Sequence, residues 1–200
     1  MRPRLFDENA VLTVAFDQFW RKGVRGTSLS DIARDVGMQR GSLYNAYGTK
    51  EALFLRAYAR YADDYLAAVA SALAVGKLRE RLERFFDVAI RNFSIGTPPR
   101  GCPTTRGLME VASIEGDELA EEVRTAFAGL LSRLTGFLRE AFAQGVASGE
   151  FSGSPDAAAE HVLTIARGLV VLESAYHDEA MLQRVAANTV DILLGAGHDI

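Results

Sequence analysis

Apolar residues recur at helical spacing along most of this 200-residue chain. Between residues 7 and 22, Leu12, Ala15, Phe16 and Phe19 follow one another at intervals of three, one and three, which places them on one face of an α-helix. No stretch shows the period-two alternation that is typical of a half-buried strand. The pattern therefore predicts an all-α fold.

Glycines, prolines and capping residues divide this pattern into short and long helices. Ser28 and Asp31 have the spacing of a capping box, and Pro155 suits the first turn of a helix. The first three helices fit a small domain and the later ones are too long for it, so we predict domains over 1–49 and 50–200. The expected helices, about nine in number, cover about 7–22, 28–37, 39–46, 50–73, 78–93, 103–113, 118–147, 155–176 and 178–194.

The charge is distributed unevenly along the chain. The net charge is −4, with 48% apolar and 24% charged residues, which is ordinary for a globular protein. Residues 1–55 carry eight Lys and Arg against six Asp and Glu, a balance of +2, whereas residues 56–200 carry a balance of −6. We therefore expect any polyanionic partner to bind the first quarter of the chain.

Several classes of site and location are not expected. Cys102 is the single cysteine, so neither an internal disulfide nor a thiolate zinc site is predicted. Glu173 and His177 stand four residues apart without a clear third ligand, which indicates an exposed pair rather than a metal site. The first residues do not resemble a secretion signal, and the apolar stretches are shorter than the ~20 residues of a membrane span. We expect a cytoplasmic protein with no cofactor and no metal.

Residues 37–54 read GMQRGSLYNAYGTKEALF and contain no acidic residue before Glu51. Two short helices joined by a tight turn through a glycine, after a longer helix, are typical of a helix-turn-helix, whose second helix enters the major groove of DNA. Leu43 would pack inward against Ile32 and Val36. The outward face would then carry Gln39, Arg40, Ser42, Asn45 and Ala46.

These outward side chains have the chemistry of base recognition. An arginine such as Arg40 suits the O6 and N7 atoms of guanine, and an asparagine such as Asn45 suits the N6 and N7 atoms of adenine. Gly41 leaves room for a close approach to the DNA backbone. Side chains of the types that hold phosphate oxygens surround this face: Ser28, Tyr44, Tyr47 and Lys50.

The stretch GTSLSDIARDVGMQRGSLYNAYGTKEALF resembles the DNA-binding segment of the TetR family of bacterial transcriptional regulators. The similarity covers about residues 7–55 and includes G-x-x-x-T-S-x-x-D-I-A, G-S-L-Y and Y-x-x-K-E-A-L-F. One departure is Gln39, where the family often has Ser or Thr, so the usual N-cap of the recognition helix is missing. The resemblance implies DNA contacts at Ser28, Ser30, Arg40, Gly41, Ser42, Tyr44, Asn45, Tyr47 and Lys50.

The resemblance also implies a homodimer formed by the last two helices and a ligand pocket in the larger domain. In the helix over 155–176, apolar residues recur at intervals of four and three from Ala158 to Tyr176, which is typical of helices packed side by side. The alternative is that this stripe faces the core of its own subunit. The predicted interface residues are Val162, Ile165, Leu169, Leu172, Val185 and Ile192.

The middle helices carry more aromatic bulk than helix packing alone demands, which favours a cavity for a small apolar or aromatic effector. The alternative is that these side chains are ordinary core. The predicted lining is Tyr61, Tyr65, Phe86, Ile90, Cys102, Met109, Phe127 and Leu131.

Cys102 has Arg100 and Arg106 close to it in the sequence, and such basic surroundings favour a reactive thiolate that senses an electrophile or oxidant. A small buried residue is the alternative.

We therefore predict a ligand-responsive transcriptional regulator, most simply a repressor that a small molecule releases from a palindromic operator. Its expected partners are double-stranded operator DNA, an unidentified effector and a second copy of the chain. One alternative is a constitutive DNA-binding protein without an effector. The other is a helical enzyme, which is disfavoured because the sequence has none of the G-x-S-x-G, H-E-x-x-H or P-loop motifs.

Overall fold

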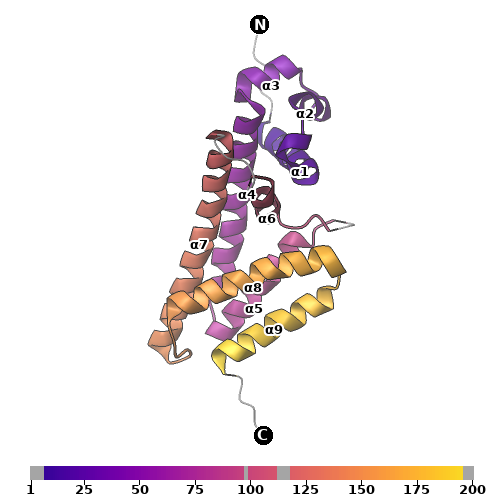
Figure 1. Cartoon of the computed structure of the whole chain (residues 1–200). Coiled ribbons are helices and arrows are strands. Elements are labelled where there is room, and N and C mark those ends of the chain that lie inside the picture. Colours follow the sequence, from indigo (N-terminus) through magenta and orange to yellow (C-terminus); the bar gives the residue numbers. More distant parts are fainter. Residues whose placement is uncertain (1–6, 97–98, 112–117, 196–200) are drawn as a thin grey trace. The chain divides into compact units, whose positions relative to one another are not determined.

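The computed structural model describes residues 7–96, 99–111 and 118–195, and every regular element in these ranges is an α-helix (Figure 1). The all-α prediction is therefore confirmed. Most bounds agree with the sequence pattern to within a few residues. The nine helices of the described ranges are α1 (Glu8–Gly26), α2 (Leu29–Asp35), α3 (Arg40–Tyr47), α4 (Lys50–Leu73), α5 (Leu78–Phe93), α6 (Pro103–Val111), α7 (Glu118–Ser148), α8 (Pro155–Tyr176) and α9 (Glu179–Leu194).

Two predicted helix ends differ from the structure for local reasons. The first helix continues to Gly26, with a break at Gly23, where φ is 77° and ψ is 169°. Glycine reaches this conformation without the strain that a side chain would bring. The second helix ends at Asp35, and the N–H of Val36 closes it on the carbonyl of Ile32 at 3.0 Å. The predicted extension of the sixth helix beyond residue 111 lies outside the described residues.

The chain forms two compact units. The first combines residues up to 64 with 106–127 and so contains α1, α2, α3, the first part of α4, α6 from Arg106 onward and the start of α7. The second combines 65–105 with residues from 128 onward. The domain boundary predicted after residue 49 stays a prediction.

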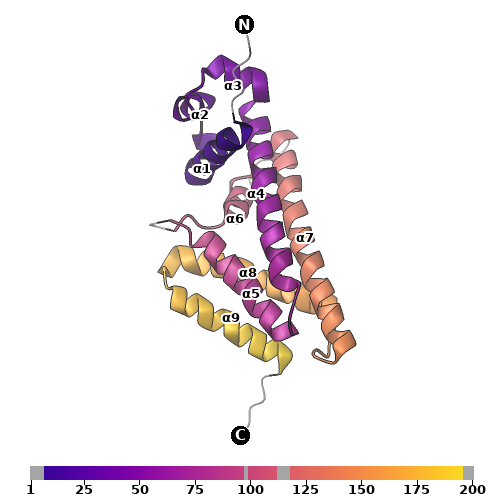
Figure 2. The same cartoon turned by 180° about the vertical axis from the view of Figure 1, so that it is seen from behind.

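Aromatic side chains form the core of the first unit. Phe19 meets Phe54 edge-on with ring centroids 5.2 Å apart, and the Tyr58 ring lies 4.6 Å from that of Phe127. Phe16 stacks on another α4 tyrosine, Tyr61, at 4.7 Å. Such edge-on and stacked pairs are favourable beyond the area that they bury. The Phe19–Phe54 and Phe16–Tyr61 pairs pack α1 against α4, and the Tyr58–Phe127 pair packs the start of α7 on α4. Figures 1 and 2 show α1, α2 and α3 grouped around the first turns of α4.

The second unit is built on α5, whose inward side chains are fully buried and include Leu82, Phe85, Phe86 and Ile90. Figure 2 shows α5 beside the helix pair α8 and α9. The Glu150 Oε2 atom caps α5 by accepting from the N–H of Leu78 at 2.6 Å. None of the helices in the described part of the chain combines the length and apolarity that crossing a membrane requires.

Candidate nucleic-acid interface and effector site

The start of α2 is fixed by a side-chain cap. Ser28 Oγ accepts from the N–H of Asp31 at 3.1 Å and donates to Asp31 Oδ2 at 2.7 Å. The Ser28 hydroxyl holds the pKa of the Asp31 carboxyl below its ordinary value. The N-cap half of the predicted capping box is therefore present, and the Asp31 carboxylate accepts from the Ser28 hydroxyl, where a full capping box would have it accept from the Ser28 backbone N–H.

Helix α3 has one buried and one exposed face. Leu43 is fully buried, as is Ile32 of α2, whereas the predicted reading residues stand on the surface. A Cβ atom added to Gly41 would meet nothing within 4 Å, so the backbone of this turn is open to a partner. The exposed residues are Arg40, Gly41, Ser42, Tyr44 and Asn45, as the sequence predicted for base and phosphate contacts.

The charged groups beside this face differ in how strongly they are held. Arg34 of α2 pairs with Asp31 at 3.0 Å and with Asp35 at 3.3 Å. Arg40, by contrast, has no carboxylate partner among the described residues. Its guanidinium can therefore bind a base edge or a phosphate without first breaking an ion pair.

Three other residues predicted to contact DNA have distinct environments. Ser30 is exposed on α2, and Lys50 lies at the start of α4 with its Nζ atom 3.8 Å from Glu51 Oε1. Tyr47 is buried, including its hydroxyl, and the Arg56 guanidinium lies 5.5 Å from the centroid of its ring. In this conformation Tyr47 supports the reading head from inside, and its hydroxyl does not face outward to a phosphate.

The N-cap position of α3 is occupied by Gln39, whose side chain makes no capping hydrogen bond. The missing cap that the sequence predicted is therefore confirmed. The first N–H groups of a helix have no partner within it, and this end of the helix dipole favours an anion. The start of α3 thus offers donors suited to a phosphate oxygen.

The predicted effector residues divide between the two units. Tyr65, Phe86, Ile90, Cys102 and Leu131 lie in the second unit. Of these, Leu131 is partly exposed and the other four are buried.

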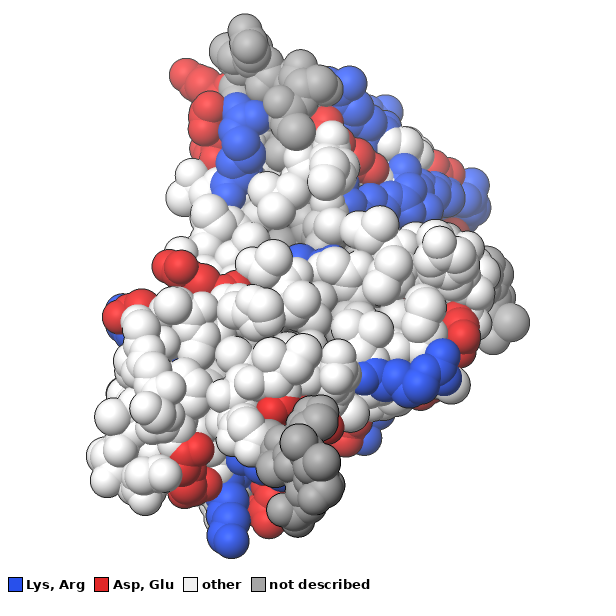
Figure 3. Space-filling view, turned by 60° about the horizontal axis from the view of Figure 1, so that its bottom comes forward, with Lys and Arg blue, Asp and Glu red and all other residues white. Residues whose placement is uncertain are grey.

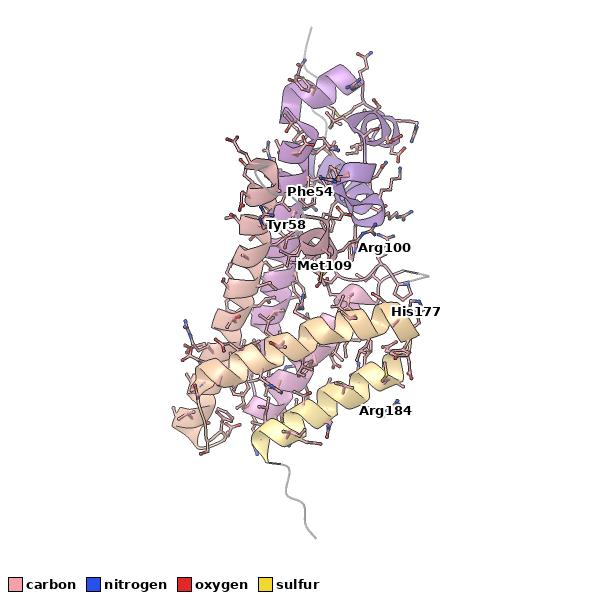
Figure 4. All side chains as sticks on the ribbon, in the orientation of Figure 1. Phe54, Tyr58, Arg100, Met109, His177 and Arg184 are labelled. Carbon is pink, nitrogen blue, oxygen red and sulfur yellow. The ribbon has the colours of Figure 1, made fainter. Side chains whose placement is uncertain are left out.

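The first unit contains Tyr61, Met109 and Phe127. Tyr61 and Phe127 belong to the aromatic core described above, and Met109 is 72% exposed on α6 (Figure 4). Their placement favours core or surface roles for these three.

A buried polar cluster in the second unit joins three of its elements. Arg167 Nη1 of α8 donates a hydrogen bond to Cys102 Sγ at 3.3 Å. Burial raises the pKa of the Tyr65 phenol, and the nearby Arg167 guanidinium partly opposes that rise. Tyr65, Cys102 and Arg167 therefore meet in one place. The sequence pattern named Tyr65 and Cys102 but missed Arg167, an arginine within the otherwise apolar stretch ARGLVVL.

The apolar stripe predicted for the dimer interface does not lie on one surface. Val162 and Leu169 are fully buried in their own subunit, Ile165, Leu172 and Val185 are partly exposed, and Ile192 is 70% exposed. A different stripe of α8 is exposed and has no Lys, Arg, Asp or Glu at its five positions, with the exposed Glu160 beside it one turn before Thr164. Its residues, spaced by three and four, are His161, Thr164, Gly168, Val171 and Ala175.

Figure 3 shows the face of the molecule with α8 and α9, where uncharged side chains cover most of the area between a few charged clusters.

The pair Glu173 and His177 differs from the expected exposed ion pair. His177 Nδ1 lies 3.7 Å from Glu173 Oε1, but Glu173 is only 3% exposed, so the prediction was wrong for the carboxylate. Among the described residues no three His, Cys, Asp or Glu side chains are grouped as a metal site would require. The periodicity of α8 explains the burial, because Glu173 follows Leu169 by one turn on the inward face.

Comparison with known proteins decides the family. Residues 11–57 match the family model described as bacterial regulatory proteins, tetR family, and residues 79–189 match the tetracyclin repressor-like C-terminal domain. The chain belongs to the TetR family. It is therefore a DNA-binding transcriptional regulator and not an enzyme.

Individual TetR-family and helix-turn-helix relatives agree with this assignment. The chain is 39% identical to the regulator YezE of Bacillus subtilis (strain 168) over 44% of this chain and 46% of YezE, so the match spans about half of that relative. It is 28% identical to the transcriptional repressor ComR of Escherichia coli (strain K12) over 72% of this chain and 69% of ComR.

Among solved structures, a cysteine mutant of the TetR family regulator CifR in complex with 26-bp operator DNA has a TM-score of 0.82 and 26% identity. The match covers 96% of this chain and 100% of CifR.

Proposed function

We propose that this TetR-family protein is a repressor that binds a palindromic operator as a homodimer and leaves it when a small molecule binds. The observation that carries the proposal is the exposed face of α3, where Arg40 and Asn45 stand outward while Leu43 is buried beneath them. Support for operator binding comes from the similarity to CifR, whose solved complex contains operator DNA. Support for repression comes from the similarity to ComR.

A second copy of the chain is needed to select one operator. A single recognition helix reaches only a few base pairs, and each good bidentate contact discriminates by about 1–3 kcal/mol. The exposed uncharged stripe of α8 gives a surface for self-association, because two such stripes at coiled-coil spacing pack against each other. Gly168 lies in the middle of the stripe, and its missing side chain lets two helices approach closely.

The effector would act on the second unit. The cluster of Tyr65, Cys102 and Arg167 offers a hydroxyl, a thiol and a guanidinium in the same unit as the buried aromatic residues of α5. Helix α4 carries Lys50 at its first residue and Tyr65 further along, so a tilt of α4 would move the reading heads relative to half-sites about 34–36 Å apart. A ligand that binds the tilted state better lowers operator affinity.

The primary test is binding to a DNA fragment from upstream of the protein's own gene, measured by fluorescence anisotropy over a range of salt concentrations. We expect the logarithm of the affinity to fall linearly with the logarithm of salt, by about 0.9 for each phosphate contacted. Arg40→Ala should weaken binding by about 1–3 kcal/mol and relax the preference at one base pair. Arg139→Ala on α7 is a matched control, since Arg139 is also exposed but lies in the second unit.

Equal loss of DNA affinity in Arg40→Ala and Arg139→Ala would contradict base reading by α3. If the protein binds no promoter fragment at low salt, the proposed function is wrong. The effector-response part has its own test. A panel of small aromatic and aliphatic compounds is screened for release of the bound fragment, and DNA binding that no compound alters would favour the constitutive alternative. Because the proposed partner is chromosomal DNA, we place the protein in the cytoplasm.

A further inference from the structure

The break in α1 separates two backbone groups that an uninterrupted helix would join. In an α-helix the N–H of each residue bonds the carbonyl four residues earlier, so the Val24 N–H would bond the Trp20 carbonyl. The non-helical Gly23 lies between them, with φ of 77° and ψ of 169°. Groups released at a break of this kind require other partners.

Two side chains of α6 supply those partners from a segment 86 residues away in sequence. Glu110 Oε2 accepts from the Val24 N–H at 3.2 Å. Arg106 Nη1 donates to the Trp20 carbonyl at 3.0 Å and to the Arg21 carbonyl at 3.2 Å. Arg106 and Glu110 also pair with each other across one turn of α6, with Nε and Oε1 3.7 Å apart.

The signs of these charges match the backbone on either side of the break. A helix that ends presents carbonyls and favours a cation, whereas a helix that begins presents N–H groups and favours an anion. The Arg106 guanidinium donates to carbonyls before the break, and the Glu110 carboxylate accepts from the N–H after it. A Cβ atom built on Gly23 would collide with the Glu110 carboxylate, so the glycine permits the approach.

The far side of the break leads directly into the reading head. Thr27 Oγ1 donates to the carbonyl of Gly23 at 2.8 Å and to that of Gln18 at 3.3 Å, and Thr27 is buried. The next residue is Ser28, the cap of α2. Gln18 Nε2 in turn donates to Asp35 Oδ2 at the end of α2. The conformation at Gly23 therefore sets how α2 leaves α1, and α3 follows α2.

We propose that Arg106 and Glu110 are positioning residues for DNA binding. They hold the break in α1 in the form that presents α2 and α3, although neither residue belongs to the reading face. The inference rests on the proposed DNA-binding function and assigns part of its affinity to α6.

The test compares Glu110→Ala, Glu110→Gln and Arg106→Ala in the full-length protein, with Arg139→Ala as the control. The first measurement is exchange of the Val24 amide hydrogen by NMR, which needs no DNA. The second is affinity for the upstream DNA fragment, and the third is thermal unfolding. We expect Glu110→Ala to speed Val24 exchange and to weaken DNA binding, each by about tenfold, because a charge-assisted hydrogen bond is lost.

Glu110→Gln should keep most of the slow Val24 exchange and most of the DNA affinity, since the glutamine amide oxygen still accepts from the Val24 N–H. Arg106→Ala should weaken DNA binding in the same direction, and Arg139→Ala should change neither. Unchanged Val24 exchange in Glu110→Ala would show that Glu110 does not hold the break in α1. Faster Val24 exchange with unaltered DNA affinity would show that Glu110 does not position the reading head. An equal loss of thermal stability in Glu110→Ala and Glu110→Gln would assign Glu110 to folding alone. If the wild type binds no DNA, the proposed function fails, while Val24 exchange still decides whether Glu110 holds the break in α1.

Discussion

Leu43 and Arg40 are three residues apart on α3, and their environments are opposite. Leu43 is fully buried, and Arg40 is exposed with no carboxylate partner among the described residues. Burying a leucine side chain stabilises the folded state by about 1.5–3 kcal/mol, which fixes the rotation of the helix about its axis. The energy that sets which side chains of α3 point outward therefore comes largely from Leu43.

Cys102 shows the same dependence on neighbours, and its reactivity can be predicted. Its side chain is 3% exposed, and the Arg167 guanidinium donates to its sulfur. We expect the thiol reagent DTNB to react on the order of tenfold more slowly, or slower still, with the native protein than with the protein in guanidinium chloride, because the surrounding structure must open first. The release of thionitrobenzoate measures the rate, and Cys102→Ser, which has no thiol, is the control for background reaction.

Chemical modification of Cys102 also tests the hypothesis that this thiol senses an electrophile or oxidant. If Cys102 belongs to the effector site, blocking it with N-ethylmaleimide should lower the affinity for the upstream DNA fragment, and Cys102→Ser should be insensitive to the reagent. Complete modification that leaves DNA binding unchanged would place Cys102 among ordinary buried residues.

At the scale of elements, α2 and α3 are too short to be stable alone, because isolated helices below about 12–15 residues are marginal in water. The order of α2 comes from its Ser28 cap and from packing on α1, and α3 packs on α2. The Ser28 cap satisfies one backbone donor of α2, and its hydroxyl also holds the Asp31 carboxylate. The helix-turn-helix thus depends on contacts at its ends as much as on its core.

Ser28→Ala should lower the free energy of unfolding by about 1 kcal/mol, the usual effect of losing an N-cap side chain. Chemical unfolding followed by circular dichroism measures it. Ser30→Ala is the matched control, because Ser30 is exposed on the same helix but does not cap it. A similar loss in both variants would contradict a specific role for the cap.

The cap also has a predicted pH dependence. The folded state depresses the pKa of Asp31, so the stability that this carboxylate contributes is present at neutral pH and is lost as the pH falls through its folded pKa. The difference between the wild type and Ser28→Ala should therefore shrink in acid.

At the scale of the whole molecule, self-association would couple two reading heads. The exposed stripe of α8 is uncharged at five positions spaced by three and four, and Val171, next to the central Gly168 in the stripe, is 58% exposed. A large exposed apolar residue in a stripe of uncharged side chains is typical of an interface. Both subunits would contribute the same stripe, as a two-fold axis requires.

Val171→Arg should convert a dimer into a monomer, because it places two like charges within that contact. Analytical ultracentrifugation measures the mass. Operator affinity should fall on the order of a hundredfold, since two linked binding events become one. Val146→Arg on α7 is the control, as Val146 is also exposed but stands outside the stripe. A wild-type monomer, or a dimer that survives Val171→Arg, would contradict this interface.

The sequence by itself determined the elements and the reading face. The bounds of α4, α5 and α8 agree with the pattern, because periodicity, glycines and caps act within a few residues of each other. The face of α3 was predictable for the same reason, since Leu43 packs inward and Asn45, two residues later, lies about half a helical turn away and is exposed. The family resemblance of residues 7–55 reflects that local pattern.

Only the tertiary structure decided which face of α8 is buried. The helix is apolar on more than one side, so its periodicity could not say whether Val162 or Val171 faces the core. Packing against α5 and α9 buries Val162 and Leu169, takes Glu173 inward with them, and leaves Val171 exposed. Likewise, Arg106 and Glu110 meet the break in α1 across 86 residues of chain. Spacing along a sequence carries no signal for such contacts, because they arise only when distant helices pack.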